Sequence, residues 1–241
     1  MQDVNTAPVA TGIPARLLHR SIGKKLLMSF SGLVLLGYVM GHLIGNLQIF
    51  VGQSALNAYA VFLHSVGVWL WLIRAFLLTM LIIHVWTALR LYFENRAARP
   101  VQYKRKTYQE ATLSSRTMIW TGIGVFLFVV YHIMHFTLIV TNPQYAHLED
   151  PLGRHDVYSM VILGFQNYLI SAVYLTSIAI VSYHLSHAAK SMFQTWGLNN
   201  NRYEPLLRKL TVIFAWLIFL GYISMPIAVL IGIVKLPEGV M

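Results

Sequence analysis

The chain has 241 residues, of which 57% are hydrophobic and only 11% are charged, and this composition excludes an ordinary soluble domain. It contains no cysteine, which excludes disulfides, thiolate-bound iron–sulfur clusters, thioether-attached haem and zinc ribbons. Any cofactor must therefore be bound by other residues, and the ten histidines are the obvious candidates. The formal charge of +10 would suit a nucleic-acid partner in a soluble protein, but here it is confined to particular loops.

Five apolar segments are long enough to cross a bilayer, which takes about 20 residues of helix. Only helices satisfy every backbone group within such segments. We therefore predict an all-α fold, an integral membrane bundle of five transmembrane helices that forms one domain over residues 1–241. No internal repeat is expected. The spans are expected at Leu26–Phe50, Val66–Tyr92, Thr117–Val140, Val157–Tyr183 and Leu210–Val234.

Basic residues are distributed unevenly between the two ends of these spans. Fifteen of the 18 Lys and Arg residues lie before the first span or around the connections between spans two and three and spans four and five. Because positively charged loops stay in the cytoplasm, we expect a cytoplasmic N-terminus with an irregular segment over residues 1–25, and no nucleic-acid partner. On the outer side we expect a short amphipathic helix over Gln53–His64, started by Ser54, and a polar loop over Asn142–Asp156.

Four of the five spans carry a histidine inside the membrane, where a polar side chain is costly. His42 and His132 each lie eight residues before the outer end of their span, so the two share one depth. His84 lies eight residues before the inner end of the second span, and His184 lies near the inner end of the fourth. The sequence thus predicts two level pairs of imidazoles, separated along the membrane normal by roughly 14 Å.

Two level imidazoles on facing helices are what a bis-histidine haem b requires. A single membrane histidine is more often an interhelical hydrogen-bonding group, but four in two matched pairs favour iron ligation. We predict two haem b groups, the outer bound by His42 and His132 and the inner by His84 and His184. Small residues nearby would let a flat macrocycle or a neighbouring helix approach closely, namely Gly32, Gly37, Gly41, Gly45, Gly122, Gly124, Ala188 and Ala189.

Two further histidines lie close to the proposed ligands. His135 and His187 each follow one by three residues, on nearly the same helix face, so spacing alone leaves either open as the true ligand. We expect them to be neighbours of the ligands or partners of the haem propionates. Three cations are also candidates for the propionates, although snorkelling to lipid headgroups is their alternative role: Arg74, Arg90 and Lys190. The histidines of the connecting segments are expected to be solvated: His19, His147 and His155.

Four strings of the sequence resemble a known family. LMSFSGLVLLGYVMGHLIGNLQIF, HVWTALRLYFENR, SRTMIWTGIGVFLFVVYHIMHF and YHLSHAAKSMFQTWGLNNN are similar to the single-chain, diheme cytochrome b anchor of succinate dehydrogenases and fumarate reductases. The resemblance runs over about residues 16 to 235, with the strings in the family's order. One departure is Ala188, where the family's HxxxG pattern has glycine. The distance from His184 to Trp196-Gly197 favours His184 over His187 as the ligand.

The resemblance implies a role in electron transfer between two partner subunits and a membrane quinone. A flavoprotein subunit and an iron–sulfur subunit would dock on the cytoplasmic face, because this chain has neither a flavin-binding glycine motif nor a cysteine for a cluster. His84 and His184 would bind the haem proximal to the iron–sulfur subunit, and His42 and His132 the distal haem. The quinone would be menaquinone or ubiquinone, and the compartment would be the cytoplasmic (inner) membrane of a prokaryote. A higher oligomer of the complex is a further expectation.

Quinone reduction takes up protons, so it needs a protonatable group beside the ring. Some members of the family carry an acidic residue about where His64 falls, and free imidazole titrates near neutrality. His64 is therefore the candidate for quinone proton transfer, with an ordinary interfacial histidine as the equally weighted alternative. Hydrogen bonds to the quinone could come from any of four polar side chains: Asn46, Gln48, Asn57 and Tyr59.

Two other functions are compatible with the composition. The cytochrome b subunit of a nitrate reductase, hydrogenase or formate dehydrogenase is also a small diheme bundle, but such subunits generally draw several ligands from fewer helices. A haem-free transporter could use the histidines as a proton relay. One ligand on each of four successive spans favours the succinate:quinone oxidoreductase anchor, and a visible difference spectrum would separate the three.

Overall fold

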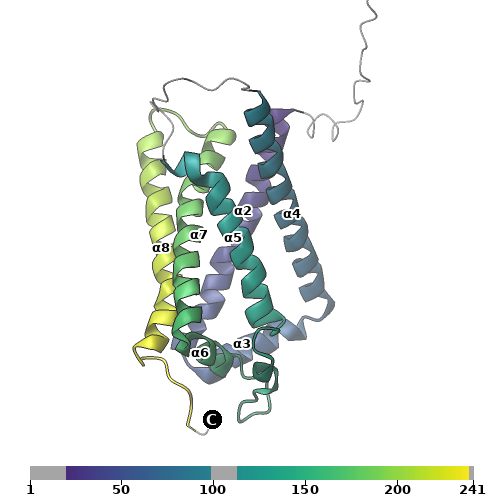
Figure 1. Cartoon of the computed structure of the whole chain (residues 1–241), viewed down its shortest axis with the longest axis vertical. Helices are drawn as coiled ribbons and strands as arrows, with labels where there is room; N and C mark the ends of the chain where they lie inside the picture. Colours follow the sequence, from purple (N-terminus) through teal and green to yellow (C-terminus); the bar gives the residue numbers. More distant parts are fainter. Residues whose placement is uncertain (1–19, 99–112, 239–241) are drawn as a thin grey trace, which may run out of the picture.

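The structure is a computed structural model that describes residues 20–98 and 113–238. Its regular structure over these residues is entirely helical. Five long helices run side by side (Figure 1): α2 (Ser21–Asn46), α4 (Val68–Ala97), α5 (Leu113–His132), α7 (Tyr168–Thr195) and α8 (Glu204–Leu230). Short helices lie at the end of the bundle where the chain leaves α2: η1 (Leu47–Phe50), α3 (Gln53–Ser65), η2 (Ile133–Thr137), η3 (Pro143–His147) and α6 (Val157–Gln166).

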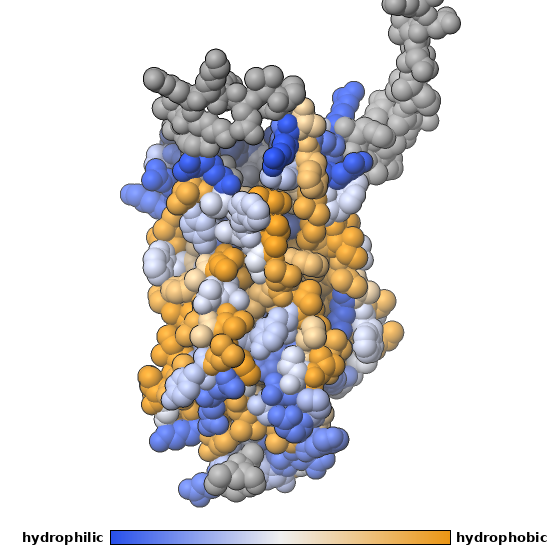
Figure 2. Space-filling view, viewed as in Figure 1, coloured by the Kyte–Doolittle hydropathy of each residue, from blue (hydrophilic) through white to orange (hydrophobic). Residues whose placement is uncertain are grey.

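The five long helices are each long and apolar enough to span a membrane, which confirms the predicted all-helical fold with five such segments. Figure 2 shows hydrophobic surface around the middle of the bundle and hydrophilic surface toward both ends. This distribution is that of a protein whose middle lies in lipid and whose ends lie in water. The odd number of long helices puts the start of α2 and the end of α8 at opposite ends (Figure 1).

The fourth predicted span is wrong at its start. The segment expected as one span over Val157–Tyr183 is broken at Asn167, so that α6 ends at Gln166 and α7 begins at Tyr168. Asn167 has an extended backbone, and its side-chain oxygen accepts hydrogen bonds from the backbone amides of Leu169 and Ile170. An asparagine that caps a helix in this way ends one helix and begins the next without interrupting the apolar run.

Other boundaries also differ from those expected. The first helix begins at Ser21, inside the segment 1–25 that was expected to be irregular, and residues 1–19 of that segment lie outside the described residues. Helix α3 begins at Gln53 as expected, but its N-cap is Gly52 rather than Ser54. Gly52 has a φ of 126°, a conformation that side-chain-bearing residues rarely adopt, so glycine is what permits the sharp entry.

A buried polar cluster joins α3 to the loop before α6. Asn57 is fully buried, and its amide donates to Asp156 Oδ1 (2.9 Å) and Asp150 Oδ2 (3.1 Å), while its Oδ1 accepts from the backbone amide of Tyr158 (3.0 Å). Arg154 pairs with Asp150 at 2.6 Å. Every hydrogen-bonding atom of the Asn57 amide side chain therefore has a protein partner, and the cluster holds the short helices across this end of the bundle.

Replacement of Asn57 by alanine is expected to lower the free energy of unfolding by roughly 2–4 kcal/mol, because it removes three hydrogen bonds and leaves two buried carboxylates with fewer donors. Thermal unfolding of the purified protein in detergent measures the change. Asn201→Ala, at an exposed position in the connection before α8, is the matched control and should unfold like the unchanged protein. Equal stability of the two variants would contradict a structural role for Asn57.

The same cluster predicts how stability depends on pH. Burial by itself raises the pKa of Asp150 and of Asp156, but hydrogen bonds from Arg154 and Asn57 to Asp150, and from Asn57 and Gln53 to Asp156, lower both pKa values overall. The unfolded carboxyls titrate near pH 4, so their stabilising contribution is complete above about pH 4 and is lost as the pH falls further. The unfolding temperature should drop below pH 4, and Asp156→Asn should flatten that drop.

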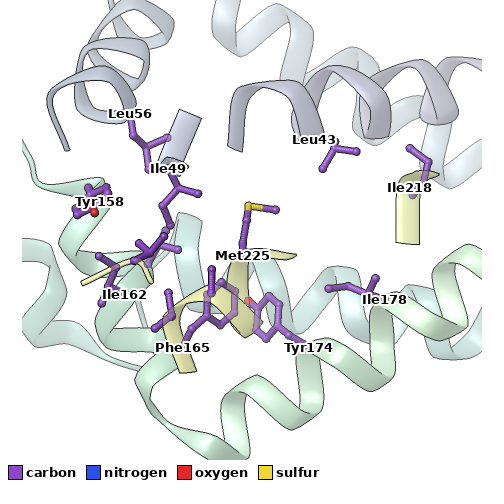
Figure 3. Close-up of a cluster of buried hydrophobic side chains, with 14 residues drawn as sticks. Leu43, Ile49, Leu56, Tyr158, Ile162, Phe165, Tyr174, Ile178, Ile218 and Met225 are labelled. Carbon is purple, nitrogen blue, oxygen red and sulfur yellow. The ribbon is translucent and has the colours of Figure 1, made fainter. Parts of the chain in front are cut away.

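The hydrophobic core lies at the same end of the bundle. Figure 3 shows Met225 of α8 between Ile49 on one side and Phe165 and Tyr174 on the other. Ile162 of α6 is completely buried in this cluster. In contrast, none of the most apolar 18-residue stretch of α4, or of α5, is buried within the described structure. The side chains of these two stretches are therefore at most half-buried within the bundle.

Four of the long helices close a ring. Helix α2 packs on α4 and α7, and α5 packs on the same two helices, so that α2 faces α5 and α4 faces α7 across the diagonals. Helix α8 lies outside the ring, against α7, α2 and α6. Within the ring, the strongest packing is between α2 and α4 and between α5 and α7. This pattern has the symmetry of a two-fold axis along the bundle.

The two halves of the ring are built alike, which corrects the expectation that the chain has no internal repeat. Each half is a long helix, a short helix and a second long helix, α2–α3–α4 and α5–α6–α7. Ser31-Gly32 stands ten residues before His42 just as Thr121-Gly122 stands ten before His132. In the second long helices, HVWTALRLYF from His84 matches HLSHAAKSMF from His184 at the histidine, the alanine four residues on, the cation and the final phenylalanine. Parallel repeats of this kind are common in membrane bundles.

Candidate functional site

His42 and His132, the pair expected to bind the outer haem and called the outer pair, meet across one diagonal of the ring. The ring centres of His42 on α2 and His132 on α5 are 5.6 Å apart, with the ring planes at 83°. Metal–imidazole bonds are about 2 Å long, so an ion between two facing rings separates the ring centres by roughly 6 Å. Aromatic side chains surround the pair, Tyr38 stacked on His42 and Phe128 against His132. The spacing therefore fits one metal ion between the two imidazoles.

The inner pair lies across the other diagonal. His184 on α7 is close enough to His84 on α4 to interact with it electrostatically. Each ring also rests against a glycine of the neighbouring helix: a Cβ on Gly32 would lie 3.1 Å from His84 Cε1, and one on Gly122 would lie 3.6 Å from His184 Cε1. The missing side chains leave room for the imidazoles to lie flat against the helix backbone.

Three of the four imidazoles have Nδ1 beside a group that can accept its proton. His84 Nδ1 is 3.1 Å from the Met28 carbonyl, His184 Nδ1 is 3.2 Å from Thr121 Oγ1, and His132 Nδ1 is 3.3 Å from Tyr174 Oη. His42 differs, because the Asn46 amide nitrogen, a donor, lies 3.3 Å from its Nδ1. Within the described residues no hydrogen bond reaches Nε2 of any of the four. Free Nε2 atoms on rings anchored through Nδ1 are typical of metal-binding histidines.

The other two intramembrane histidines lie elsewhere. His135 is fully buried on the short π-helix η2, where its ring lies tilted against Phe136 with ring centres 4.0 Å apart and its Nδ1 lies 3.0 Å from Tyr174 Oη. It does not face His42. His187 lies one turn beyond His184 and interacts with Lys190. The structure thus pairs His132 with His42 and His184 with His84, and it leaves His135 and His187 beside these pairs.

The three cations proposed for propionates have different surroundings. Arg74 lies over the ring of Trp71, 5.0 Å from its centre, and within electrostatic reach of Tyr38, the residue stacked on His42. Arg90 lies 5.9 Å from the centre of the Trp86 ring. Lys190 donates to Glu204 of α8 at 2.8 Å, so it already has a carboxylate partner. Of the three, Arg74 is the one placed beside a candidate ligand pair.

The residues proposed for quinone chemistry do not form one group. His64 is exposed in the last turn of α3, with its side chain outside the buried polar cluster. Tyr59 lies against Gly45, where a Cβ would come within 2.6 Å of its ring, and Asn46 lies beside His42. Asn57 is committed to Asp150 and Asp156, which corrects its selection as a quinone ligand.

Three residues that contact the histidines were not identified from the sequence, namely Ser31, Thr121 and Tyr174. Hydroxyl residues are common in membrane helices, so no single one of them stands out. The internal repeat is the signal that could have found the first two, because Ser31 and Thr121 precede the equivalent glycines Gly32 and Gly122.

Comparison with known proteins gives no match: no protein-family model, curated protein or solved structure matches the chain. The functional assignment therefore depends on the arrangement of the histidines and on the resemblance of the four strings that contain them.

Proposed function

We propose that the chain is a diheme cytochrome b, the membrane anchor and quinone-reactive subunit of a succinate:quinone oxidoreductase. The observation that carries the proposal is that four histidines form two pairs across the ring of helices. His42 faces His132 across one diagonal, and His84 lies near His184 across the other. Bis-imidazole haem b needs two imidazoles from facing helices, each with Nε2 available. The glycines against which the inner rings lie fit a flat macrocycle beside them.

In this proposal the chain's residues bind and orient the cofactors, and two haem b groups supply one-electron transfer across the membrane. His42 and His132 would bind the outer haem, and His84 and His184 the inner. Arg74 would neutralise an outer propionate, since it lies beside Tyr38 and has no carboxylate partner among the described residues. Lys190 is the weaker candidate, because Glu204 already pairs with it.

The proposed partner subunits are inferred from the basic charge at the end of the bundle that lies nearest His84 and His184. The start of α2, the ends of α4 and α7 and the start of α8 meet there, with exposed basic residues that include Arg20, Arg96, Arg202 and Arg208. We propose that this end is cytoplasmic and receives the iron–sulfur and flavoprotein subunits, which would carry out the dicarboxylate chemistry. The opposite end, with its short helices, would face outward from the inner membrane of a prokaryote.

A reduced-minus-oxidised visible spectrum of the purified chain tests the proposal. Two b-type haems per chain are expected, and succinate should reduce them only when the partner subunits are present. Absence of a b-type haem band would contradict the proposal and favour a haem-free transporter. A single haem per chain would contradict the two-pair arrangement.

His64 is the proposed group for proton exchange with the quinone, because it is exposed at the outer end beside the start of α4. His64→Leu is expected to lower quinone turnover by roughly a hundredfold or more, the range of general acid–base effects, and to leave both haem spectra intact. Steady-state quinone reduction by the whole complex measures the loss. His147→Leu, at another exposed histidine of the same end, is the control and should keep full turnover. Unchanged turnover in the His64 variant would remove the assignment.

A further inference from the structure

We infer that Tyr174 is a positioning residue for the outer haem ligand, joining His132 to His135 in one hydrogen-bonded chain. The inference rests on the proposed function, in which His132 binds iron. It goes beyond that function because it names a residue on a different helix that fixes the ligand without touching the iron.

Tyr174 has one position available to it. Its side chain is 3% exposed, and its ring makes edge-to-face contacts with Phe165, Phe128 and Phe136 at centre distances of 5.0, 5.3 and 5.6 Å. The hydroxyl therefore lies at a fixed point between two imidazoles, 3.3 Å from His132 Nδ1 and 3.0 Å from His135 Nδ1. A phenol locked in this way cannot turn toward other partners.

The direction of the hydrogen bonds follows from how many protons the groups carry. If His132 binds iron through Nε2, its proton must be on Nδ1, so Nδ1 donates to Tyr174 Oη. The single proton of the Tyr174 hydroxyl is then free to be donated to His135 Nδ1. His135 in turn must carry its proton on Nε2, and Nε2 is a buried nitrogen without a partner in the described structure. The unpartnered atom is thus the end of the chain.

The internal repeat shows that this arrangement is specific to one half of the ring. Tyr174 stands ten residues before His184, and Arg74 stands at the same place before His84. His135 follows His132 by three residues, and the equivalent residue after His42 is Gly45. The first half, α2–α3–α4, has the same order of helices as the second half, but it has neither the phenol nor the second imidazole. Both groups are therefore present beside one ligand and absent from the equivalent places beside the other.

The backbone around His135 departs from regular helix in the same place. The π-helix η2 covers Ile133–Thr137, and Ile139 just beyond it has a φ of 55°, which is unfavourable for a β-branched residue. Single-turn π-helices often occur at functional sites. Gly164 of α6 accommodates the displaced ring, because a Cβ there would lie 3.2 Å from His135 Cε1.

The test is a redox titration of the two haems in the purified protein carrying Tyr174→Phe. Loss of the acceptor for Nδ1–H makes the His132 imidazole a weaker electron donor, which favours reduced iron. The outer haem should therefore titrate at a higher midpoint potential, with the inner haem unchanged. The variants His84→Leu and His42→Leu, which each keep one haem, assign the two titration waves. Thr121→Val should move the inner wave instead, because Thr121 lies beside His184 Nδ1.

Two further variants make the test specific. Tyr131→Phe removes a hydroxyl from the same aromatic cluster, one that forms no hydrogen bond to a histidine among the described residues, and should move neither wave. His135→Leu removes the acceptor beyond the phenol and should raise the outer potential by a smaller amount than Tyr174→Phe, because hydrogen bonds in a chain strengthen one another.

An outer wave that stays in place in Tyr174→Phe, with both haems bound, overturns the inference and leaves the proposed function standing. Loss of the outer haem in that variant, combined with an unmoved outer wave in His135→Leu, also overturns it, since Tyr174 would then serve packing alone. Absence of haem from the unaltered protein overturns the proposed function and the inference together.

Discussion

The variant His42→Leu is expected to contain one haem per chain where the unaltered protein contains two. Leucine has no nitrogen to bind iron, and no other imidazole of the described residues faces His132 at a comparable distance. The His42 and His132 rings are 5.6 Å apart across the ring of helices, whereas His135 packs against Phe136. The inner haem should remain, because His84 and His184 belong to the other diagonal. Pyridine haemochrome measurement of haem per chain gives the result directly.

The reciprocal variant is the control for this prediction. His84→Leu should also leave one haem. The haem that remains in His84→Leu should differ in midpoint potential from the haem that remains in His42→Leu, because the outer and inner ligands have different neighbours. Retention of two haems in either variant would show that the ligand pairs are not those of the diagonals. His135→Leu and His187→Leu should both keep two haems, and loss of one in either would transfer the ligand role to that residue.

The sequence predicts the number of long helices because hydropathy reports directly on the lipid environment. It does not predict the break at Asn167, since the segment from Val157 to Tyr183 is mainly apolar on both sides of the Gln166-Asn167 pair. The difference between one span and two helices lies in a capping hydrogen bond, from the Ile170 amide to the Asn167 side chain, and such a bond leaves no mark on average hydropathy.

The pairing of the four histidines could be predicted in part. Equal depth in two spans is a property of residue numbers, and it places His42 level with His132 without any knowledge of packing. Which helices face one another is not a property of any one segment. The structure adds that α2 faces α5 across the ring. It also shows that His135 lies on a π-helix, where its side chain contacts Tyr174 and Phe136 and is not paired with His42.

The internal repeat was hidden by unequal connections. His42 and His84 are 42 residues apart, whereas His132 and His184 are 52 apart, so no fixed period relates the two halves along their whole length. The additional residues fall in the loop before α6, the loop that supplies Asp150 and Asp156 to the buried polar cluster. Loops tolerate insertions at little thermodynamic cost, so they separate helices that are otherwise equivalent.

A valine at Gly32 is expected to remove the inner haem and leave the outer one. The Cβ alone would lie 3.1 Å from His84 Cε1, and the branched carbons of valine would occupy space that the imidazole now fills. His84 would have to rotate away from the Met28 carbonyl, to which its Nδ1 is bound at 3.1 Å, and Nε2 would turn with it. Haem content per chain and the number of titration waves report the loss.

Two other variants show whether this effect belongs to the site. Leu33 follows Gly32 on the same helix and its side chain is exposed, so Leu33→Val should keep both haems. Gly122 is the equivalent of Gly32 in the second half of the ring, with its Cβ position 3.6 Å from His184 Cε1. Because both glycines leave space for an imidazole of the same pair, Gly122→Val should lose the same haem as Gly32→Val. Loss of the outer haem from either variant would contradict the assignment of that pair to a single cofactor.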